Sequence, residues 1–185
     1  LSSGEKFSVY YLTVSGHQIY SYNSNAQSNK NSDAVKDLPY DEEAVKAYIA
    51  CNLELEKAMK LLMERLDEAG VLENTVIALS ADHYPYAMTD DELNELAGHE
   101  LDMDFEVYKN AFLIYKKGMQ GEKIDTPCCT LDILPTISNL FGLEYDSRLL
   151  MGRDIFSSSE PLVFLSDRSF ITRYGKYSSR TGKFT

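Results

Sequence analysis

The sequence lacks any run of about 18 to 20 apolar residues, the length that a helix needs to cross a bilayer. Its longest apolar blocks, such as residues 111–115, have the length of a strand. No part of the chain is therefore expected to span a membrane. The chain begins "LSSGEKFSVYYL", without an initiator Met, a basic segment or an apolar signal core. We expect a piece of a longer protein, whose signal or membrane anchor would lie outside this sequence.

Positive charge is also scarce. The 18 Lys and Arg residues stand against 29 Asp and Glu residues, which gives a net charge of -11. Such a chain repels a phosphate backbone, so nucleic acid is not expected as the main partner. A small anionic substrate would need a local positive centre.

Cysteine is too scarce for a disulfide framework. Cys51 falls in a helical pattern, and Cys128 and Cys129 are adjacent. All three are expected to be small, partly buried side chains, and they do not decide the redox compartment.

What the sequence does contain is typical of a folded protein. Its 185 residues can bury one core, and 44% hydrophobic with 25% charged residues excludes disorder of the whole chain. Length favours a single domain.

The first half of the chain shows alternating strand and helix signals. Residues 6–16 are β-branched and aromatic, which predicts a buried strand, and residues 21–39 are rich in Ser and Asn, which predicts a long, flexible polar loop. Apolar residues at three- and four-residue steps predict a helix over 41–70, and residues 75–79 predict a second strand. Together they predict a β-loop-α-β unit with parallel strands and a right-handed crossover.

The second half continues the alternation. Thr89 and Glu92 have capping-box spacing, with Gly98 as a stop, and predict a short helix. The remaining expected elements are a strand near 110–118, a helix over 130–142 with Thr130 as a cap and Leu131, Leu134, Ile137 and Leu140 on one face, a strand at 161–165, and a hairpin at 169–185. This order predicts an α/β fold.

The stretch "VIALSADHYPYAM" places Asp82 and His83 where the predicted strand 75–79 ends. Ligands of α/β sheets collect at the carboxyl ends of strands. His17 also follows a predicted strand, so parallel strands would bring it to the same rim. A carboxylate with an imidazole suits Mn²⁺ or Zn²⁺, but a catalytic site needs three or four ligands, and this segment supplies two.

Each of these residues also has an ordinary structural interpretation. An Asp-His dipeptide is commonly a turn with a surface histidine, and His17 could pack against neighbouring tyrosines. His99 is expected to be a surface residue in an acidic stretch, and the eight carboxylates between Asp90 and Glu106 are expected to form a solvated face. Tyr84 is expected to pack at the rim of the core, or to contact a substrate because it adjoins His83.

Several stretches, in order, resemble one family: "YYLTVSGHQIY", "YIACNLELEKAMKLLMERLDEAGVLENTVIALSADHYPY", "NAFLIYKKG", "TLDILPTISNLFGLEYDSRLLMGRDIF" and "PLVFLSDRSFIT". They look like the carboxyl-terminal part of a sulfatase-like domain of the alkaline phosphatase superfamily, closest to lipoteichoic acid synthase-like phosphoglycerol transferases. The similarity covers residues 7–172. It implies that residues 1–185 are an incomplete half of one α/β catalytic domain, with a sheet and flanking helices.

The resemblance also implies residue roles. Asp82 and His83 match the family's paired metal ligands, which hold a divalent cation, often Mn²⁺, with Zn²⁺ or Mg²⁺ as alternatives. His17 matches a histidine that contacts phosphoryl oxygens of an anionic phosphate-ester or glycerophosphate substrate. The family's Thr nucleophile lies upstream of this sequence, so the fragment alone is expected to be inactive. The resemblance further implies an extracytoplasmic enzyme anchored to the membrane through upstream segments.

Two alternatives stay open. A sulfate-ester hydrolase would carry the C/S-x-P-x-R maturation signature, which neither Cys128 nor Cys129 begins, although that signature would normally lie upstream. A non-catalytic binding module would instead use the acidic residues 90–106 and the Ser/Asn-rich residues 21–39, and would tolerate loss of Asp82 and His83.

Overall fold

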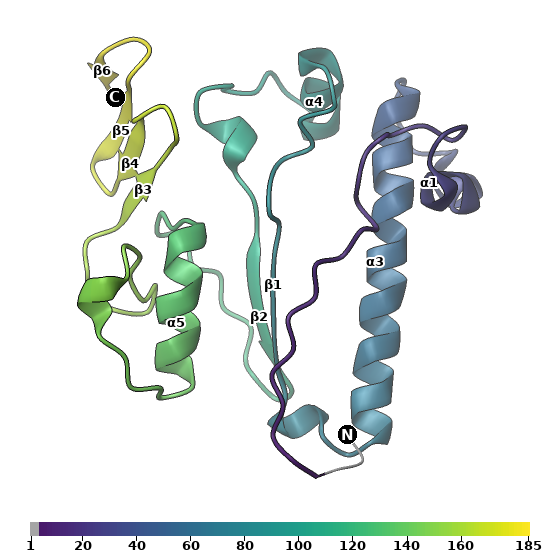
Figure 1. Ribbon diagram of the computed structural model, residues 1–185. Helices are drawn as coiled ribbons and strands as arrows, with labels where there is room; N and C mark the ends of the chain where they lie inside the picture. The colour runs from purple at the N-terminus through teal and green to yellow at the C-terminus, as the bar shows by residue number, and fades with distance from the viewer. Residues whose placement is uncertain (1–3) are drawn as a thin grey trace. The chain divides into compact units, whose positions relative to one another are not determined.

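The computed structural model describes residues 4–185, which form two compact units, residues 4–120 and residues 121–185 (Figure 1). Both helices and strands occur in each unit. The described residues contain two small antiparallel sheets, β1-β2 in the first unit and β3-β4-β5-β6 in the second. The chain therefore has the predicted mixed α/β class.

A long helix, α3 (Glu43–Glu68), packs against the other helices of the first unit. It begins with acidic Glu43, carries Arg65 in its last turn and is followed by Gly70 at φ 70°, a left-handed conformation that favours glycine. Its buried face is made of the residues Val45, Ala47, Ala50, Cys51 and Leu66. The helix predicted from periodicity is confirmed.

Residues 21–39, which we name the Ser/Asn segment, are not the predicted flexible loop. They form two short helices, α1 (Ala26–Lys30) and α2 (Ser32–Val35), which pack against α3. Asn25 caps α1 by accepting hydrogen bonds from the N–H groups of Gln27 and Ser28. The prediction was wrong because it treated Ser and Asn as solvent-facing, whereas short polar side chains also bond to the backbone of a neighbouring helix.

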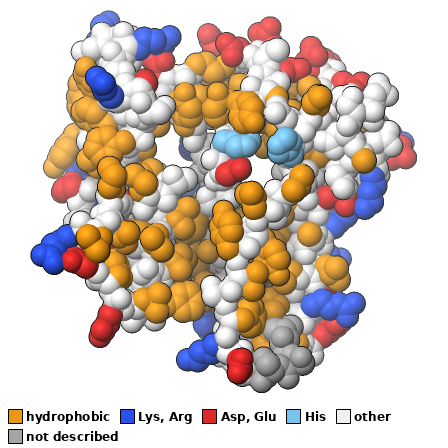
Figure 2. Space-filling model, viewed as in Figure 1, with side chains coloured by type: hydrophobic (Ala, Val, Ile, Leu, Met, Phe, Trp, Pro, Cys, Tyr) orange, Lys and Arg blue, Asp and Glu red, His pale blue; other side chains and the backbone are white. Residues whose placement is uncertain are grey.

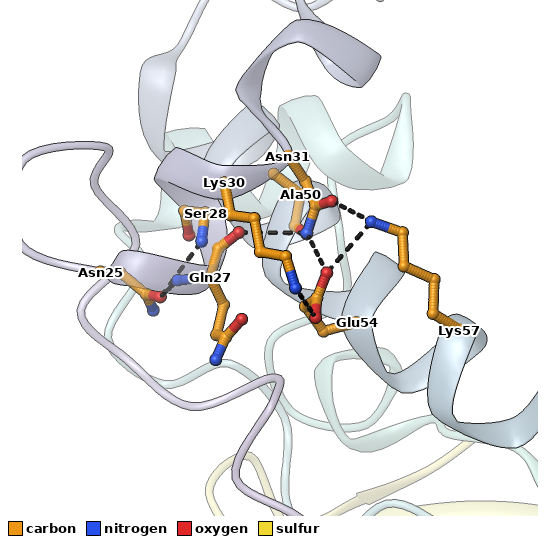
Figure 3. Close-up of polar contacts among 8 residues, drawn as sticks. All are labelled: Asn25, Gln27, Ser28, Lys30, Asn31, Ala50, Glu54 and Lys57. Carbon is orange, nitrogen blue, oxygen red and sulfur yellow. Dashed lines mark hydrogen bonds and ion pairs between the residues drawn. The ribbon is translucent and has the colours of Figure 1, made fainter. Parts of the chain in front are cut away.

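Figure 3 shows the polar contacts between α1 and α3. Buried Ser28 Oγ donates to the Ala47 carbonyl at 2.8 Å, and Asn31 Nδ2 donates to the Ala50 carbonyl at 3.1 Å and to Glu54 Oε1 at 2.9 Å. Glu54 also pairs with the Nζ atoms of Lys30 at 2.8 Å and of a second lysine, Lys57, at 3.1 Å. Hydrogen bonds from Lys30, Asn31 and Lys57 lower the pKa of Glu54 to about 2.

Strand β1 (Val76–Ser80) pairs antiparallel with β2 (Phe112–Lys116), with Val76 opposite Lys116 and Ser80 opposite Phe112. Both strands were predicted, and Gly118 turns the chain after β2 at φ 81°. The predicted parallel pairing of residues 75–79 with residues 6–16 does not occur.

Residues 6–14, which we name the apolar segment, form no strand. In the view of Figure 1 this segment passes between α3 and β1. Within residues 4–185 no hydrogen bond is recorded for the backbone of residues 6–13, and Tyr10 is 88% exposed. The strand prediction was wrong because residue type gives only propensity, and a strand also requires a partner for its N–H and C=O groups.

Helix α4 (Asp90–Ala97) carries the predicted capping box between Thr89 and Glu92, and Gly98 ends it at φ 76°. Leu93 of α4 and Met88 just before it are buried. They pack in the core of the first unit, which comprises Tyr20, Val45, Ala47, Cys51, Met88 and Leu93.

The second unit contains α5 (Ile133–Leu140) and the sheet β3 (Leu162–Phe164), β4 (Phe170–Thr172), β5 (Gly175–Ser178) and β6 (Lys183–Phe184). The predicted strand at 161–165 and the hairpin that follows it are confirmed. The described chain also has four short 3₁₀ helices: Leu72–Asn74, Glu106–Tyr108, Thr130–Asp132 and Ser147–Leu149.

Helix α5 begins and packs differently from the prediction. Cys129, not Thr130, caps the preceding 3₁₀ turn, and Leu134 on the predicted apolar face is 58% exposed. The buried residues of α5 are Pro135, Thr136 and Ser138. Buried Asp132, just before the helix, accepts hydrogen bonds from the backbone N–H groups of Cys129 at 2.9 Å and Arg153 at 2.8 Å. The inward side of α5 is therefore not the leucine face that the sequence predicted.

The three cysteines are free thiols. Cys51 is buried and Cys129 is partly buried, as expected, whereas Cys128 is exposed. No helix in the described part of the chain is both long enough and apolar enough to cross a membrane.

Candidate active site

The first part of the site is the loop that carries His17. The backbone N–H of His17 donates to the Val14 carbonyl at 3.0 Å, and the His17 carbonyl accepts from Asn25 Nδ2 at 3.0 Å. Gly16 lies so close to α3 that a Cβ there would be 2.9 Å from Asn52 Oδ1. The cap of α1 and the close approach at Gly16 therefore fix the backbone of His17.

Tyr20 anchors the other end of this loop in the core. Its side chain is buried, its ring meets that of Tyr48 edge-on at 5.1 Å, and its hydroxyl donates to the Gly16 carbonyl at 3.3 Å. Burial, followed by the nearby Tyr48 and Cys51, raises the pKa of Tyr20 to about 12. Tyr20 is thus a neutral hydrogen-bond donor that holds the loop.

The second part of the site is the loop that follows β1. Asp82 and His83 come directly after this strand, and the His83 Nε2 atom lies 3.6 Å from Asp82 Oδ2. The two side chains are 43% (His83) and 67% (Asp82) exposed, so both are open to a ligand. Met88, buried in the core, holds the end of the loop.

In both histidines the Nδ1 atom contacts the carbonyl of the next residue. His17 Nδ1 lies 2.7 Å from the Gln18 carbonyl, and His83 Nδ1 lies 2.7 Å from the Tyr84 carbonyl. A carbonyl oxygen can only accept, so each Nδ1 must carry the hydrogen. The Nε2 atoms are therefore left to bind a metal ion or, once protonated, an anion.

The two loops meet through a residue pair that the sequence interpretation did not single out. Gln18 Nε2 donates to the Tyr86 hydroxyl at 3.5 Å, and the Tyr86 ring lies 4.7 Å from the His83 ring. Tyr86 and Asp82 also contribute to the raised pKa of Tyr20. Figure 2 shows two histidine side chains close together next to an acidic one. In the sequence Gln18 adjoins His17 and Tyr86 lies three residues after His83, but no local pattern signals that the two residues meet.

The donor set fits part of a divalent metal site. Ligands of a tetrahedral metal ion lie roughly 2.0–2.2 Å from it, so two donors on one ion are roughly 3.3–3.6 Å apart. The separation of 3.6 Å between Asp82 Oδ2 and His83 Nε2 lies at the upper end of this range. Among residues 4–185, no group of three or more His, Cys, Asp or Glu side chains is placed to hold a metal ion. The roles of Asp82 and His83 as ligands stay predictions.

The remaining candidates have structural surroundings of their own. Tyr84 is partly buried, and its ring meets Tyr86 at 6.3 Å and Tyr108 at 5.5 Å, both edge-on. This is the expected rim packing, and its contact with a substrate stays a prediction. His99 is exposed, as predicted, and pairs with Glu106 at 3.1 Å. That bond is the main cause of the lowered pKa of Glu106.

Three of the eight carboxylates between Asp90 and Glu106 are exposed and the other five are partly buried. Figure 2 shows acidic side chains gathered at the edge of the face where α4 lies in Figure 1. Some of the partly buried ones have structural partners: Glu92 completes the capping box of α4, and Glu95 accepts hydrogen bonds from the N–H groups of Asp41 and Glu42 and so ties α4 to the start of α3. The stretch is therefore only in part the expected solvated face.

These features define a mixed α/β protein whose loop after β1 carries a carboxylate and an imidazole, with a second imidazole on the loop of His17. The family model described as Sulfatase matches residues 1–143. The chain belongs to the sulfatase family.

Curated relatives narrow the similarity within this family. The chain is 26% identical over 190 residues to "Lipoteichoic acid synthase-like YvgJ" of Bacillus subtilis (strain 168), covering 94% of the chain and 29% of that protein. It is 24% identical over 180 residues to "Lipoteichoic acid synthase 1" of the same organism, covering 95% of the chain and 27% of that protein. It is 26% identical over 137 residues to "Lipoteichoic acid synthase" of Staphylococcus aureus (strain NCTC 8325 / PS 47), covering 72% of the chain and 21% of that protein. The chain thus spans less than a third of the length of these relatives.

Proposed function

We propose that this chain supplies one side of the active site of a metal-dependent enzyme that transfers phosphoglycerol groups or hydrolyses phosphate esters. The observation that carries this proposal is the exposed Asp82–His83 pair, with His83 Nδ1 held by a backbone carbonyl and Nε2 directed to the carboxylate side. Membership of the sulfatase family and the similarity to lipoteichoic acid synthases support it.

Asp82 and His83 would hold a divalent cation, with Mn²⁺ as the first candidate and Zn²⁺ or Mg²⁺ as alternatives. Such an ion supplies charge neutralisation at the phosphoryl group. Further ligands and the nucleophile would come from polypeptide outside these 185 residues, so the chain by itself would be inactive.

His17 would provide the local positive centre that an anionic substrate needs in a chain of net charge -11. Its Nδ1 hydrogen is directed to the Gln18 carbonyl, so a second proton on Nε2 would make the ring a cation facing the site. A protonated imidazole donates strong hydrogen bonds to phosphoryl oxygens. The substrate proposed is a phosphate ester or glycerophosphate, and the full-length enzyme would act on the outer side of the membrane, anchored through segments beyond this sequence.

Sulfate-ester hydrolysis is the second candidate, favoured by the description of the matching family. An assay of the full-length polypeptide with two aryl substrates distinguishes the two reactions. A phosphoglycerol transferase or phosphate-ester hydrolase would cleave an aryl phosphodiester, and a sulfatase would cleave an aryl sulfate. A non-catalytic binding module predicts that neither is cleaved.

A Mn²⁺ titration by calorimetry tests the metal site directly. We expect Asp82→Ala to weaken Mn²⁺ binding by at least about tenfold, because it removes one of two protein ligands. Asp33→Ala is the matched control, since Asp33 is 97% exposed on α2 and its only recorded ion pair is a 3.6 Å contact with Lys36. Equal Mn²⁺ affinities for the Asp82 variant and the control would remove Asp82 from the ligand set.

A further inference from the structure

Tyr86 occupies a position between the two candidate histidine loops. Its ring centroid lies 4.7 Å from that of His83, with the ring planes inclined by 52°. Its backbone N–H donates to the Tyr84 carbonyl at 2.8 Å, the same oxygen that His83 Nδ1 contacts. One carbonyl therefore contacts both the imidazole of His83 and the backbone of Tyr86.

The hydroxyl of Tyr86 is only half used by the protein. It accepts from Gln18 Nε2 at 3.5 Å, and a phenol can accept and donate at once. Within residues 4–185, no acceptor for its own hydrogen is recorded, and the residue is 51% exposed. The hydroxyl can therefore donate to a molecule that enters the site from solvent.

Tyr84, by contrast, has its ring engaged in packing. It is partly buried, with edge contacts to Tyr86 and Tyr108, and it packs against the core of the first unit. Of the two tyrosines that follow His83, Tyr86 is the more exposed.

We propose that Tyr86 has two separate roles at this site. Its hydroxyl donates a hydrogen bond to a non-bridging oxygen of the phosphate-ester substrate, and its ring positions His83 so that Nδ1 stays on the Tyr84 carbonyl and Nε2 stays on the side of Asp82. This inference rests on the proposed function and adds a substrate-contacting and positioning residue to it. Gln18 is part of the same arrangement, because it orients the hydroxyl from the loop of His17.

The hydroxyl is tested in the full-length polypeptide with an aryl phosphodiester as substrate and glycerol phosphate as competitive inhibitor. We expect Tyr86→Phe to raise the inhibition constant of glycerol phosphate and the KM about tenfold, with kcat within about twofold, because one hydrogen bond to a charged oxygen is lost. Tyr174→Phe is the control, since Tyr174 is 77% exposed in the second unit and its hydroxyl has no recorded contact there. An unchanged inhibition constant in Tyr86→Phe would overturn the hydroxyl role.

The ring is tested without any metal, by nitrogen NMR of the imidazoles in the 185-residue chain. In the unsubstituted chain and in Tyr86→Phe, His83 should remain in the single Nδ1–H form, since phenylalanine keeps the ring contact. In Tyr86→Ala the ring contact is gone, and both tautomers of His83 should appear. A single Nδ1–H form in Tyr86→Ala would overturn the positioning role.

These outcomes are separable from failure of the proposed function. If Asp82→Ala abolishes Mn²⁺ binding while Tyr86→Phe behaves as the unsubstituted protein, the proposed function stands and the hydroxyl role of Tyr86 is wrong. If the full-length polypeptide cleaves no phosphodiester and Asp82→Ala binds Mn²⁺ normally, the proposed function fails and the inference fails with it.

Discussion

Burial in two regions of the first unit is the opposite of what their composition suggests. The polar Ser/Asn segment, residues 21–39, has buried side chains, whereas the apolar segment, residues 6–14, is largely exposed. The Ser/Asn segment contains Ser28 and Val35 at 0% and 1% exposure, whereas in the apolar segment Tyr10 and Val14 are 88% and 75% exposed. Both belong to the first unit. The difference teaches that the available partner decides burial, and that residue type alone does not.

The polar segment is buried because α3 offers matching groups. The carbonyls of Ala47 and Ala50 accept hydrogen bonds from Ser28 and Asn31, so those buried polar atoms are satisfied. No such partner for the apolar segment lies among the described residues. Its side chains contribute to the hydrophobic surface that is visible in Figure 2.

Hydrogen exchange should show the largest contrast between the two regions. Amides of residues 7–13, which have no recorded acceptor, should exchange at close to unstructured rates, whereas the buried amides of Ala50 and Cys51 in α3 should exchange at least about 10³-fold more slowly. The measurement is exchange followed by NMR or mass spectrometry on the 185-residue chain. Equal protection in the two regions would mean that the apolar segment is paired in solution.

A matched pair of substitutions should give the next largest effect. Val35→Asp places a charge at a site that is 1% exposed and should reduce the free energy of unfolding by about 3–5 kcal/mol. Val14→Asp, at a site that is 75% exposed, should change it by less than about 0.5 kcal/mol. Urea unfolding of both variants provides the measurement, and similar losses in the two would contradict the contrast.

The smallest effect concerns the charge network of the Ser/Asn segment. The pKa of Glu54 is lowered to about 2 in the folded chain, so its stabilising contribution is present above the unfolded pKa of about 4.3 and is lost as the pH falls toward 2. Glu54→Gln should therefore flatten the dependence of stability on pH between about 4.5 and 2.

Exposed Glu56 on the same helix gives the control for this experiment. Unfolding by urea at several pH values should show the flatter curve for Glu54→Gln and the unchanged curve for Glu56→Gln. Parallel curves for the unsubstituted chain and Glu54→Gln would show that the network with Lys30 and Lys57 does not stabilise the fold.

The sequence predicted the elements that carry strong local signals. Helix α3, the capping box of Thr89 and Glu92, and strand β1 all depend on contacts within a few residues or on a clear apolar period. The pairing of the strands was not predictable in the same way. Strand β1 pairs antiparallel with β2 and not in parallel with residues 6–16. The direction and register of a strand pair depend on which segments the tertiary structure brings together.

The candidate site shows the same division. Asp82, His83 and His17 could be named from their places after predicted strands and from a family resemblance. The link between Gln18 and Tyr86 joins residues 68 positions apart, and nothing in either local pattern signals it.

By itself, the sequence determined the α/β class, the long helix, the cap of α4 and the adjacency of a carboxylate and an imidazole after a strand, because these follow from spacing along the chain. Tertiary structure decided that Ser28 and Asn31 are buried, that residues 6–13 have no backbone hydrogen bond within residues 4–185, and that Tyr86 meets Gln18. The physical reason is that burial and hydrogen bonding over long range need a partner, and the identity of that partner is not written in either segment alone.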